Sequence, residues 1–286
     1  MKKFFLAAAI TLGAVASCSQ SGPKKAVDMN DQPFAEIPEF TITAPPAELG
    51  LDPWYKKYID VNGIGLASSW RCPDSALTAA YRTIYYMTNY LPKDVHDSLV
   101  RYKTRVTCMG RYEGTTDVPE HRYLVNDTTL NWDLRARGLG GTKYHPLTSC
   151  AEENVLGYQI DKYHAEDILI HEFSHSIHLV GLVTARPDIN ERLQKGLDQA
   201  LAAGKYQNTY AATNIEEYWA EGVQNWFNVN AEVPEKNGNG KHNWINTREE
   251  MKRYDPYLYD IIAEFFPEPK DKISCHKYVN EYNWTE

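Results

Sequence analysis

Apolar residues recur along the chain at the spacing typical of helices, and in one short run at the spacing typical of a strand. Residues 105–109, Arg-Val-Thr-Cys-Met, predict a strand because a β-branched and apolar run of this length suits a buried sheet. Proline at helix starts, glycine after helix ends and a capping box of Thr247 with Glu250 mark the helices. The predicted helices cover 73–91, 92–102, 187–203 closed by Gly204, and a segment near Tyr254.

The segment after Lys162 predicts a helix that is mostly buried. Its apolar residues Ile168, Leu169, Ile170, Phe173, Ile177, Leu179 and Val180 leave little polar surface. The one polar strip consists of His164, Asp167, His171, Ser174, His175 and His178. No Lys or Arg occurs between Lys162 and Arg186, so this strip is not an ordinary solvated face. A row of imidazoles facing a cleft fits the pattern better.

The stretch His171-Glu172-Phe-Ser-His175 carries the most specific chemistry of the chain. On a helix, two histidines four residues apart lie on one face about one turn from each other, so both imidazoles can reach one zinc ion. Glu172 lies beside them as a candidate general base. The alternative is a pair of core histidines whose nitrogens bind backbone carbonyls.

A catalytic zinc ion needs a third protein ligand and keeps a fourth position for water. The metzincin pattern places a glycine and then a histidine after the second motif histidine, but here His178 precedes Gly181. His178 is also two helical turns from His171, too far for both to bind one ion comfortably. We therefore interpret His178 as a residue that supports the site or packs in the core.

A better third ligand lies in the segment 214–221, where Asn214 is a suitable N-cap for a helix that extends to Phe227. Glu217 and Glu221 share one face of this helix, so Glu217 can bind the metal while Glu221 accepts a hydrogen bond from a ligand histidine. A structural explanation also fits, because acidic residues stabilise the first turn of a helix. Glu216 and Glu221 stay open as alternative ligands.

Together these residues resemble the catalytic core of the anthrax lethal factor type of gluzincin metallopeptidases. That family has His-Glu-Phe-Gly-His, and a tyrosine seven residues before a Glu-Phe-Phe-Ala-Glu segment. The corresponding residues here are His171-Glu-Phe-Ser-His175, Tyr210 and Glu217-Tyr-Trp-Ala-Glu221. Ser174 replaces the family glycine, a small-for-small change outside the coordination sphere. The resemblance covers roughly residues 161–227. The stretches 137–142 and 152–154 are similar, less specifically, to bacterial secreted proteins of the wider zincin group.

The resemblance implies a site and an activity. It assigns His171, His175 and Glu217 as zinc ligands, Glu172 as general base, Tyr210 as a transition-state donor and Glu221 as a support of the site. It implies a zincin-like α+β domain, mainly helical around a small mixed sheet, that hydrolyses peptide bonds of a peptide or protein substrate. Residues 154–158, just before the motif helix, are the candidate strand along which an extended substrate lies.

Two other functions are compatible with the sequence. Seven tryptophans and 20 tyrosines suit a surface lipoprotein that binds glycan or peptide by aromatic stacking without catalysis. Such a protein would not need Glu172 between two histidines. A vestigial or structural zinc site is the other alternative, and it predicts a closed shell of four protein ligands.

The first residues predict export. Lys2 and Lys3 precede an apolar run over 4–16 that is too short to span a membrane, and Val-Ala-Ser-Cys18 resembles the bacterial lipobox. We expect a signal peptide over 1–17, a lipid-anchored tether over 18–46 that starts at Cys18, and one catalytic domain over 47–286. The expected location is the cell envelope, at the outer membrane. Cleavage by ordinary signal peptidase, with Cys18 incidental, is the alternative.

The net charge limits which partners the protein can bind, and the cysteine spacing limits which cysteine chemistry is expected. Removal of Lys2 and Lys3 changes the formal net charge from −8 to −10, and there is no basic patch, so nucleic acid is a poor partner. We expect a monomer that contacts the membrane through its lipid anchor only. Beyond Cys18, the four cysteines Cys72, Cys108, Cys150 and Cys275 include no Cys-x-x-Cys pair. Disulfides and buried thiols both stay open.

Overall fold

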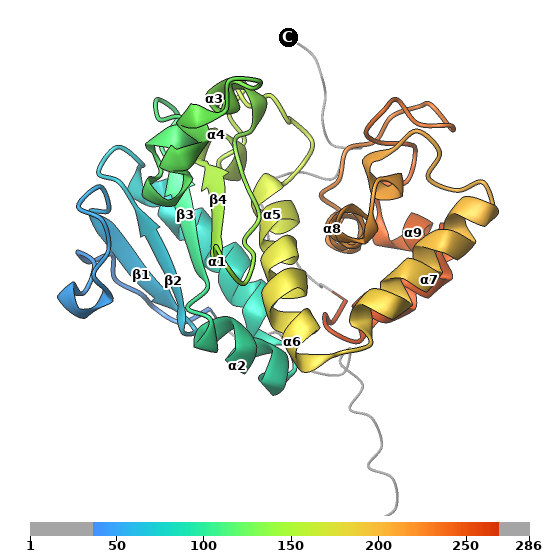
Figure 1. The fold of residues 1–286 in the computed structure, drawn as a ribbon, viewed down its shortest axis with the longest axis horizontal. Coiled ribbons are helices and arrows are strands. Elements are labelled where there is room, and N and C mark those ends of the chain that lie inside the picture. Colours follow the sequence, from blue (N-terminus) through green and yellow to red (C-terminus); the bar gives the residue numbers. More distant parts are fainter. Residues whose placement is uncertain (1–36, 269–286) are drawn as a thin grey trace, which may run out of the picture.

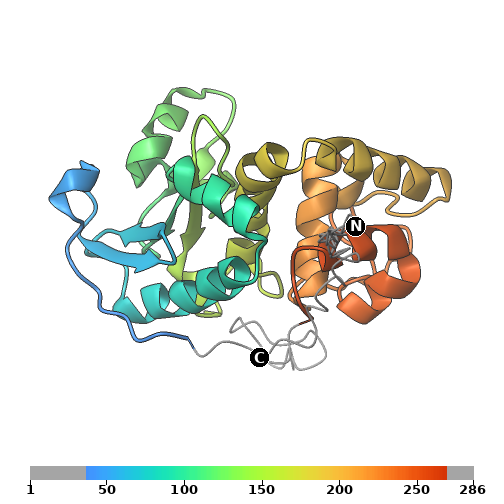
Figure 2. The ribbon, with the colours of Figure 1, turned by 90° about the horizontal axis from the view of Figure 1, so that it is seen from below.

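The computed structural model describes residues 37–268, which form two parts on either side of one long helix (Figure 1). A sheet with its helices precedes the long helix in the chain, and a group of helices follows it. The view from below shows the same arrangement, with the long helix between the two parts (Figure 2). The expected α+β architecture with a small mixed sheet is confirmed.

The sheet has four strands in the order β1-β2-β3-β4. They are β1 (Lys57–Val61), β2 (Ile64–Ser68), β3 (Arg105–Met109) and β4 (Leu147–Ala151). β1 and β2 are antiparallel, while β2, β3 and β4 run parallel. Asn62 and Gly63 both have positive φ, the two-residue turn that suits the right-handed twist of a hairpin. The predicted strand 105–109 is confirmed as β3.

The crossover from β2 to β3 consists of α1 (Asp74–Asn89) and α2 (Lys93–Arg101). Each begins directly after a proline, Pro73 or Pro92, whose fixed φ and missing N–H suit a helix start. α1 buries an apolar face that includes Leu77 and Ile84. Both helices match the predicted segments 73–91 and 92–102 to within two residues.

The connection from β3 to β4 is long and mostly irregular. It contains the 3-10 turns Thr115–Asp117 and Pro119–Asn126 and the short helix α3 (Trp132–Arg135). It ends in an extended segment in which Leu139 pairs antiparallel with Ser149 of β4. The sheet therefore gains one more extended stretch beyond β4.

The predicted strand at 154–158 is wrong. These residues begin inside α4 (Glu152–Val155), where the Leu156 N–H bonds the Glu152 carbonyl at 3.0 Å, and they continue into a turn at Gly157 with φ 65°. The short apolar run lacks the period-2 alternation that separates a strand from a helical turn. The buried strand lies just before it, as β4.

The long helix is continuous from Ile168 to Ala185. It comprises α5 (Ile168–Ser176), a π-helical turn (Ile177–Leu182) and α6 (Val183–Ala185). By length and composition it is apolar enough to cross a membrane, but 72% of it is buried inside the protein. A helix that is apolar nearly all round belongs in a core, and this one packs between the two parts.

The helical part contains α7 (Ile189–Ala202), α8 (Ile215–Trp226), α9 (Arg248–Tyr254) and α10 (Pro256–Ala263). A 3-10 turn, Tyr210–Ala212, lies just before α8. The predicted glycine after α7 and the capping box of α9 are both present. Trp219 of α8 is fully buried, and its indole N–H bonds the Ser174 carbonyl at 2.9 Å, which fixes α8 against α5.

Three of the cysteines are buried free thiols: Cys72, Cys108 and Cys150. Cys108 and Cys150 are register partners in β3 and β4. Hydrogen bonding to Cys108 and burial raise the pKa of the Cys72 thiol, which keeps it protonated. Of the two possibilities considered, these three are buried thiols; Cys275 lies outside the described residues.

The predicted leader 1–17 and Cys18 also lie outside the described residues. Of the predicted tether 18–46, residues 37–46 are described. There the Phe40 ring lies 4.0 Å from the ring of Tyr81 in α1, and Thr43 pairs with Tyr58 in β1. A 3-10 turn, Ala47–Leu49, follows.

Candidate metal centre

The two motif histidines lie one turn apart on α5, as the spacing predicts. The Asp167 side chain caps the helix by accepting the Ile170 N–H at 2.9 Å, so α5 starts with regular geometry before the motif. His171 and His175 are both buried, and their Nε2 atoms are 3.2 Å apart. Two ring nitrogens that face each other at this distance are arranged as ligands of a common ion.

Glu217 reaches the same point from α8. Asn214 caps α8 by accepting the Glu217 N–H at 2.8 Å, which places Glu217 in the first turn as predicted. Glu217 Oε2 is 3.2 Å from His171 Nε2 and 3.8 Å from His175 Nε2. The structure thus brings together the three residues expected to bind zinc.

Glu172 lies beside this group, and its carboxylate is within 4.8 Å of ligand atoms of both histidines. Burial raises the pKa of Glu172 to about 7, although the positive charge of His171 and the peptide N–H of Gly140 oppose this. A carboxylate with a pKa near neutrality is suited to accept and return a proton. Because Glu217 comes closer to both rings, Glu172 fits the function of base better than that of third ligand.

The surroundings of the two histidines shift their pKa values in opposite directions. Burial lowers the pKa of His171, but the hydrogen bond with Glu217 and the charges of Glu172 and Glu221 outweigh it and raise the value to about 10. Burial and the charge of His171 lower the pKa of His175 to about 3. With His171 protonated and His175 neutral, one positive charge lies beside Glu217. These three side chains together suit a divalent cation.

The group that orients His171 is Gln224. Its Oε1 lies 2.8 Å from His171 Nδ1, and its Nε2 donates to the Asp167 carbonyl at 3.2 Å. Glu221, which we expected in this position, is 3.8 Å from the same nitrogen. Gln224 follows Glu217 by seven residues, which is two helical turns along the same face. The helical spacing was therefore a sequence signal for this residue.

Glu221 instead supports the site through His242. His242 lies between two carboxylates, with Nε2 2.9 Å from Glu166 and Nδ1 3.4 Å from Glu221. Burial lowers the pKa of His242, but Glu166 and Glu221 outweigh it and raise the value to about 10. This buried ion pair links the loop before α9 to α8 and to the residue before Asp167. The sequence contained no local signal for it, because His242 is far from both carboxylates in the chain.

His178 does not reach the ion site. Its ring is buried, and Nε2 lies 2.8 Å from the side-chain oxygen of Asn190 in α7. It therefore packs in the core and ties the long helix to α7. This agrees with its interpretation as a residue outside the ligand set.

Tyr210, the expected transition-state donor, lies in the 3-10 turn before α8 and lines the same cleft. Its hydroxyl oxygen accepts a hydrogen bond of 2.8 Å from the guanidinium of Arg135 in α3. Since the arginine donates, the phenolic hydrogen stays available for another acceptor. Arg135 belongs to the sheet-bearing part and Tyr210 to the helical part, so their contact crosses the cleft.

The cleft has a volume of about 340 Å³, and its walls include the extended segment at 138–140, α5 and α8. Leu139 exchanges two backbone hydrogen bonds with Ser149, at 2.9 and 3.3 Å. In an extended chain the N–H and C=O groups of successive residues point to opposite sides. The N–H and C=O groups of Gly138 and Gly140 are therefore directed away from β4. This segment, rather than 154–158, is the strand edge beside the site.

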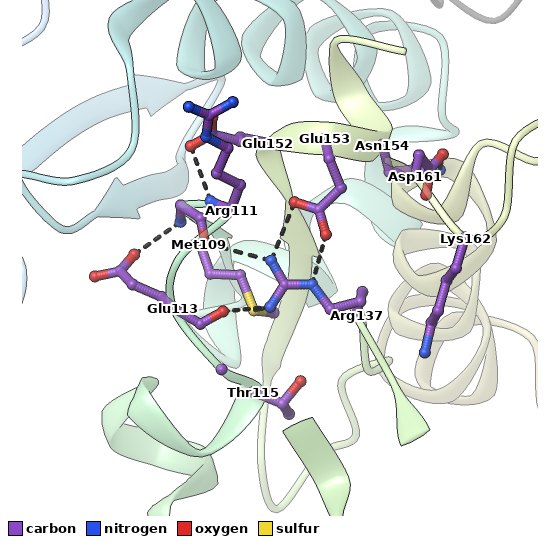
Figure 3. Close-up of polar contacts among 12 residues, drawn as sticks. Met109, Arg111, Glu113, Thr115, Arg137, Glu152, Glu153, Asn154, Asp161 and Lys162 are labelled. Atoms are coloured by element: carbon purple, nitrogen blue, oxygen red, sulfur yellow. Dashed lines mark hydrogen bonds and ion pairs between the residues drawn. The ribbon is translucent and has the colours of Figure 1, made fainter. Parts of the chain in front are cut away.

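A buried ionic network holds that edge in place (Figure 3). Arg137 bonds both carboxylate oxygens of Glu153, at 2.5 and 3.0 Å, and also donates to the Glu113 carbonyl. The Thr115 hydroxyl donates to the Ala136 carbonyl at 2.6 Å. Such a paired arginine is costly to disrupt, because loss of one partner leaves a buried charge uncompensated.

Comparison with known proteins shows no family for the chain, but it does show a similar solved structure. No model of a protein family matches the chain, and no curated protein matches it either. Among solved structures, the chain is similar to that of the Pro-Pro endopeptidase PPEP-2 from Paenibacillus alvei. The identity is 15%, the match covers 70% of this chain and 96% of that chain, and the TM-score is 0.47. The assignment of a function therefore depends on the residues of this chain.

Proposed function

We propose that the protein is a zinc-dependent endopeptidase of gluzincin type. The observation that supports this most strongly is the convergence of His171, His175 and Glu217 on one point, with Glu172 beside them in a cleft. Two imidazoles and one carboxylate are a ligand set of catalytic zinc.

The donor spacing fits that ion. Zinc held tetrahedrally at about 2.1 Å from each ligand atom separates those atoms by about 3.4 Å. The observed separations are 3.2, 3.2 and 3.8 Å. Glu217 Oε2 is buried, and its nearest partners among the described residues are the Nε2 atoms of the two histidines, which is the arrangement that a shared cation requires.

In this proposal the protein's residues perform the proton transfers. Zinc, when bound, polarises a peptide carbonyl and lowers the pKa of a water molecule. Glu172 accepts the proton of the attacking water and later returns it to the leaving amine. The Tyr210 hydroxyl donates to the carbonyl oxygen as negative charge develops there, and the hydrogen bond from Arg135 keeps the phenol aimed into the cleft.

The substrate chain lies against the edge at 138–140 in extended form. The outward peptide groups of Gly138 offer hydrogen bonds to an added strand. Glycine at position 140 lets this edge lie close to α5, since a Cβ there would lie 2.6 Å from the Cβ of His175. The scissile bond is thereby placed between Glu172 and Tyr210.

Two measurements test the proposal. Metal analysis should find one zinc per chain in the purified protein and none in His171→Ala. In a peptide-library digest followed by mass spectrometry, Glu172→Gln should retain zinc but lose at least about 100-fold in cleavage rate. Glu216→Gln, which changes a neighbouring acid of the same cleft, is the matched control and should retain zinc.

Each competing function predicts a different result. A non-catalytic binding protein predicts no cleavage by the wild type, and a structural zinc site predicts zinc without cleavage. Equal cleavage by Glu172→Gln would disprove the mechanism. Zinc retained by Glu217→Ala would shift the third ligand to Glu216, Glu221 or Glu172.

The cellular location is part of the proposal. The leader and Cys18 support an exported lipoprotein whose catalytic domain is anchored at the outer membrane and acts outside the cytoplasm. Cys18→Ser should release the protein from the membrane fraction, as judged by immunoblotting of washed membranes. An unchanged distribution would contradict the anchor.

A further inference from the structure

Two cationic side chains flank Tyr210 in the cleft. Arg135 donates to the Tyr210 hydroxyl at 2.8 Å, and the Tyr210 N–H donates to the Lys241 carbonyl at 2.7 Å. Both cations line the cleft, one from α3 and one from the loop before α9. Tyr210 is thus held by its side chain to one cation and by its backbone to the residue that carries the other.

The position of Arg135 is fixed by a third cation. Lys162 Nζ donates to the carbonyls of Leu134 and Arg135 at 2.9 and 3.0 Å, at the carboxyl end of α3 where a positive charge is favourable. Burial and then the charges of Arg135, Arg137 and Lys241 lower the pKa of Lys162. These three charges therefore lie close enough to Lys162 to repel its ammonium group.

Within residues 37–268, neither Arg135 nor Lys241 forms an ion pair. Arg137 nearby is different, because Glu153 neutralises it (Figure 3). Three acidic residues of the cleft already contact histidines. Glu217 faces His171, and both Glu166 and Glu221 bind His242.

Arg135 and Lys241 act on acidic residues of the cleft only at longer range, since the charge of Arg135 contributes to a lower pKa of Glu217 and the charge of Lys241 to a lower pKa of Glu166. Glu216 acts on His178 and so belongs to the end of the cleft near the π-helical turn, whereas Arg135 and Lys241 lie at the Tyr210 end. A guanidinium has five N–H donors, and Tyr210 uses one of those on Arg135. The remaining donors and the Lys241 ammonium are suited to a carboxylate.

We propose that Arg135 and Lys241 form a subsite that binds a carboxylate of the substrate close to the scissile bond. The inference rests on the proposed peptidase function and specifies its substrate class. Since Arg135 touches the tyrosine that faces the scissile carbonyl, and one residue spans about 3.5 Å, the carboxylate belongs to a residue within about two positions of that bond. Its source is an acidic side chain or the free carboxyl terminus of the substrate.

The first experiment measures cleavage preference. Zinc-loaded wild-type protein digests acetylated, amidated peptide mixtures, and mass spectrometry locates each cut. Asp or Glu should be enriched about tenfold over Asn or Gln at one position near the cut, and the enrichment should decline as salt rises from 0.05 to 0.5 M, because salt screens exposed charges. The same mixtures with a free carboxyl terminus separate the two sources of carboxylate.

Variants of Lys241 connect the preference to the subsite without changing the contact of Arg135 with Tyr210. Lys241→Gln should reduce the acidic enrichment several-fold, and Lys241→Arg should restore it. Lys93→Gln is the matched control, because Lys93 is exposed on α2, where it pairs with Asp97. An enrichment that is equal in wild type and Lys241→Gln would overturn the subsite.

A second experiment reads binding without catalysis. Immobilised, zinc-loaded Glu172→Gln protein selects peptides from the same mixtures, and the retained peptides are sequenced. Acidic enrichment without cleavage by wild type would support the subsite and disprove the peptidase function. Cleavage without acidic enrichment would disprove the subsite alone, and the absence of both would disprove both.

Discussion

Gln224 holds the His171 ring at Nδ1, the nitrogen that does not face the proposed zinc site. Its amide oxygen receives the Nδ1–H and its amide N–H bonds the Asp167 carbonyl, so the side chain is fixed at both ends. When His171 gives up its second proton, the hydrogen bond to Gln224 keeps the remaining proton on Nδ1, and Nε2 is then free to bind metal. A neutral amide does this without adding a further negative charge to those of Glu217, Glu172 and Glu221.

Replacing Gln224 with Ala should weaken zinc binding by about 10- to 100-fold, because the ring loses its fixed tautomer and orientation. The measurement is a zinc titration in competition with a chromogenic chelator. Gln224→Glu keeps an acceptor at the same place and should retain most of the affinity, which separates positioning from general loss of packing. Equal zinc affinity in wild type and Gln224→Ala would show that Gln224 does not orient the ligand.

Residues that act through helical spacing could be predicted from sequence, and residues brought together by tertiary packing could not. His171, His175, Glu172 and Glu217 lie where one-turn spacing and an N-cap place them. His242 reaches the cleft from a loop and Arg135 from the short helix α3, and the position of both depends on packing. Gln224 lies on the same helix face as Glu217, so helical spacing also indicates it. The sequence prediction chose Glu221 because carboxylates often accept a hydrogen bond from a ligand histidine.

At the scale of elements, the cleft depends on how closely the segment at 138–140 approaches α5. A Cβ on Gly140 would lie 2.6 Å from the Cβ of His175, and a Cβ on Gly138 would lie 2.6 Å from Cγ2 of Ile168, both in α5. Real Cβ atoms do not come this close, so larger residues would push the edge away from the motif helix. The two glycines are required by proximity and not by backbone conformation.

Gly140→Ala should therefore lower kcat/KM by about tenfold or more, because it shifts the substrate edge relative to Glu172. Gly196→Ala in α7 is the matched control, since its Cβ would lie 2.7 Å from the Tyr257 side chain of α10, away from the cleft. Both variants should lower the melting temperature in thermal denaturation, but only Gly140→Ala should reduce activity per folded molecule. A parallel loss of activity in both would attribute the effect to stability.

The elements that sequence predicted best carry their own boundary signals. Pro73, Asn214 and the Thr247 capping box each fix a helix start, and these helices form where expected. The segment at 154–158 had no such signal, and the hydrogen bonds of α4 decided its structure. The edge at 138–140 is glycine-rich and was not predicted as a strand, because its extended form depends on pairing with Ser149.

At the scale of the whole molecule, the proposed zinc site joins two helices from different parts of the chain. α5 carries two ligands and α8 carries the third. The Arg135–Tyr210 hydrogen bond crosses the same cleft from the other side. A ligand that binds only this folded arrangement stabilises it by mass action.

Zinc should accordingly raise the thermal stability of the protein. At a free zinc concentration of 1,000 times Kd the gain is about 4 kcal/mol, which corresponds to a rise of about 10 °C in melting temperature for a chain of this size. Differential scanning calorimetry of EDTA-treated protein, with and without added zinc, measures this shift.

His171→Ala provides the decisive control for the thermal shift. Unfolded chains also bind zinc through exposed thiols, and this variant keeps Cys72, Cys108 and Cys150 while it lacks one ligand of the folded site. Its melting temperature should not rise with zinc, and binding to the unfolded thiols should lower it slightly. If wild type and His171→Ala respond alike, zinc does not bind at the junction of α5 and α8, and the metal site proposed there is wrong.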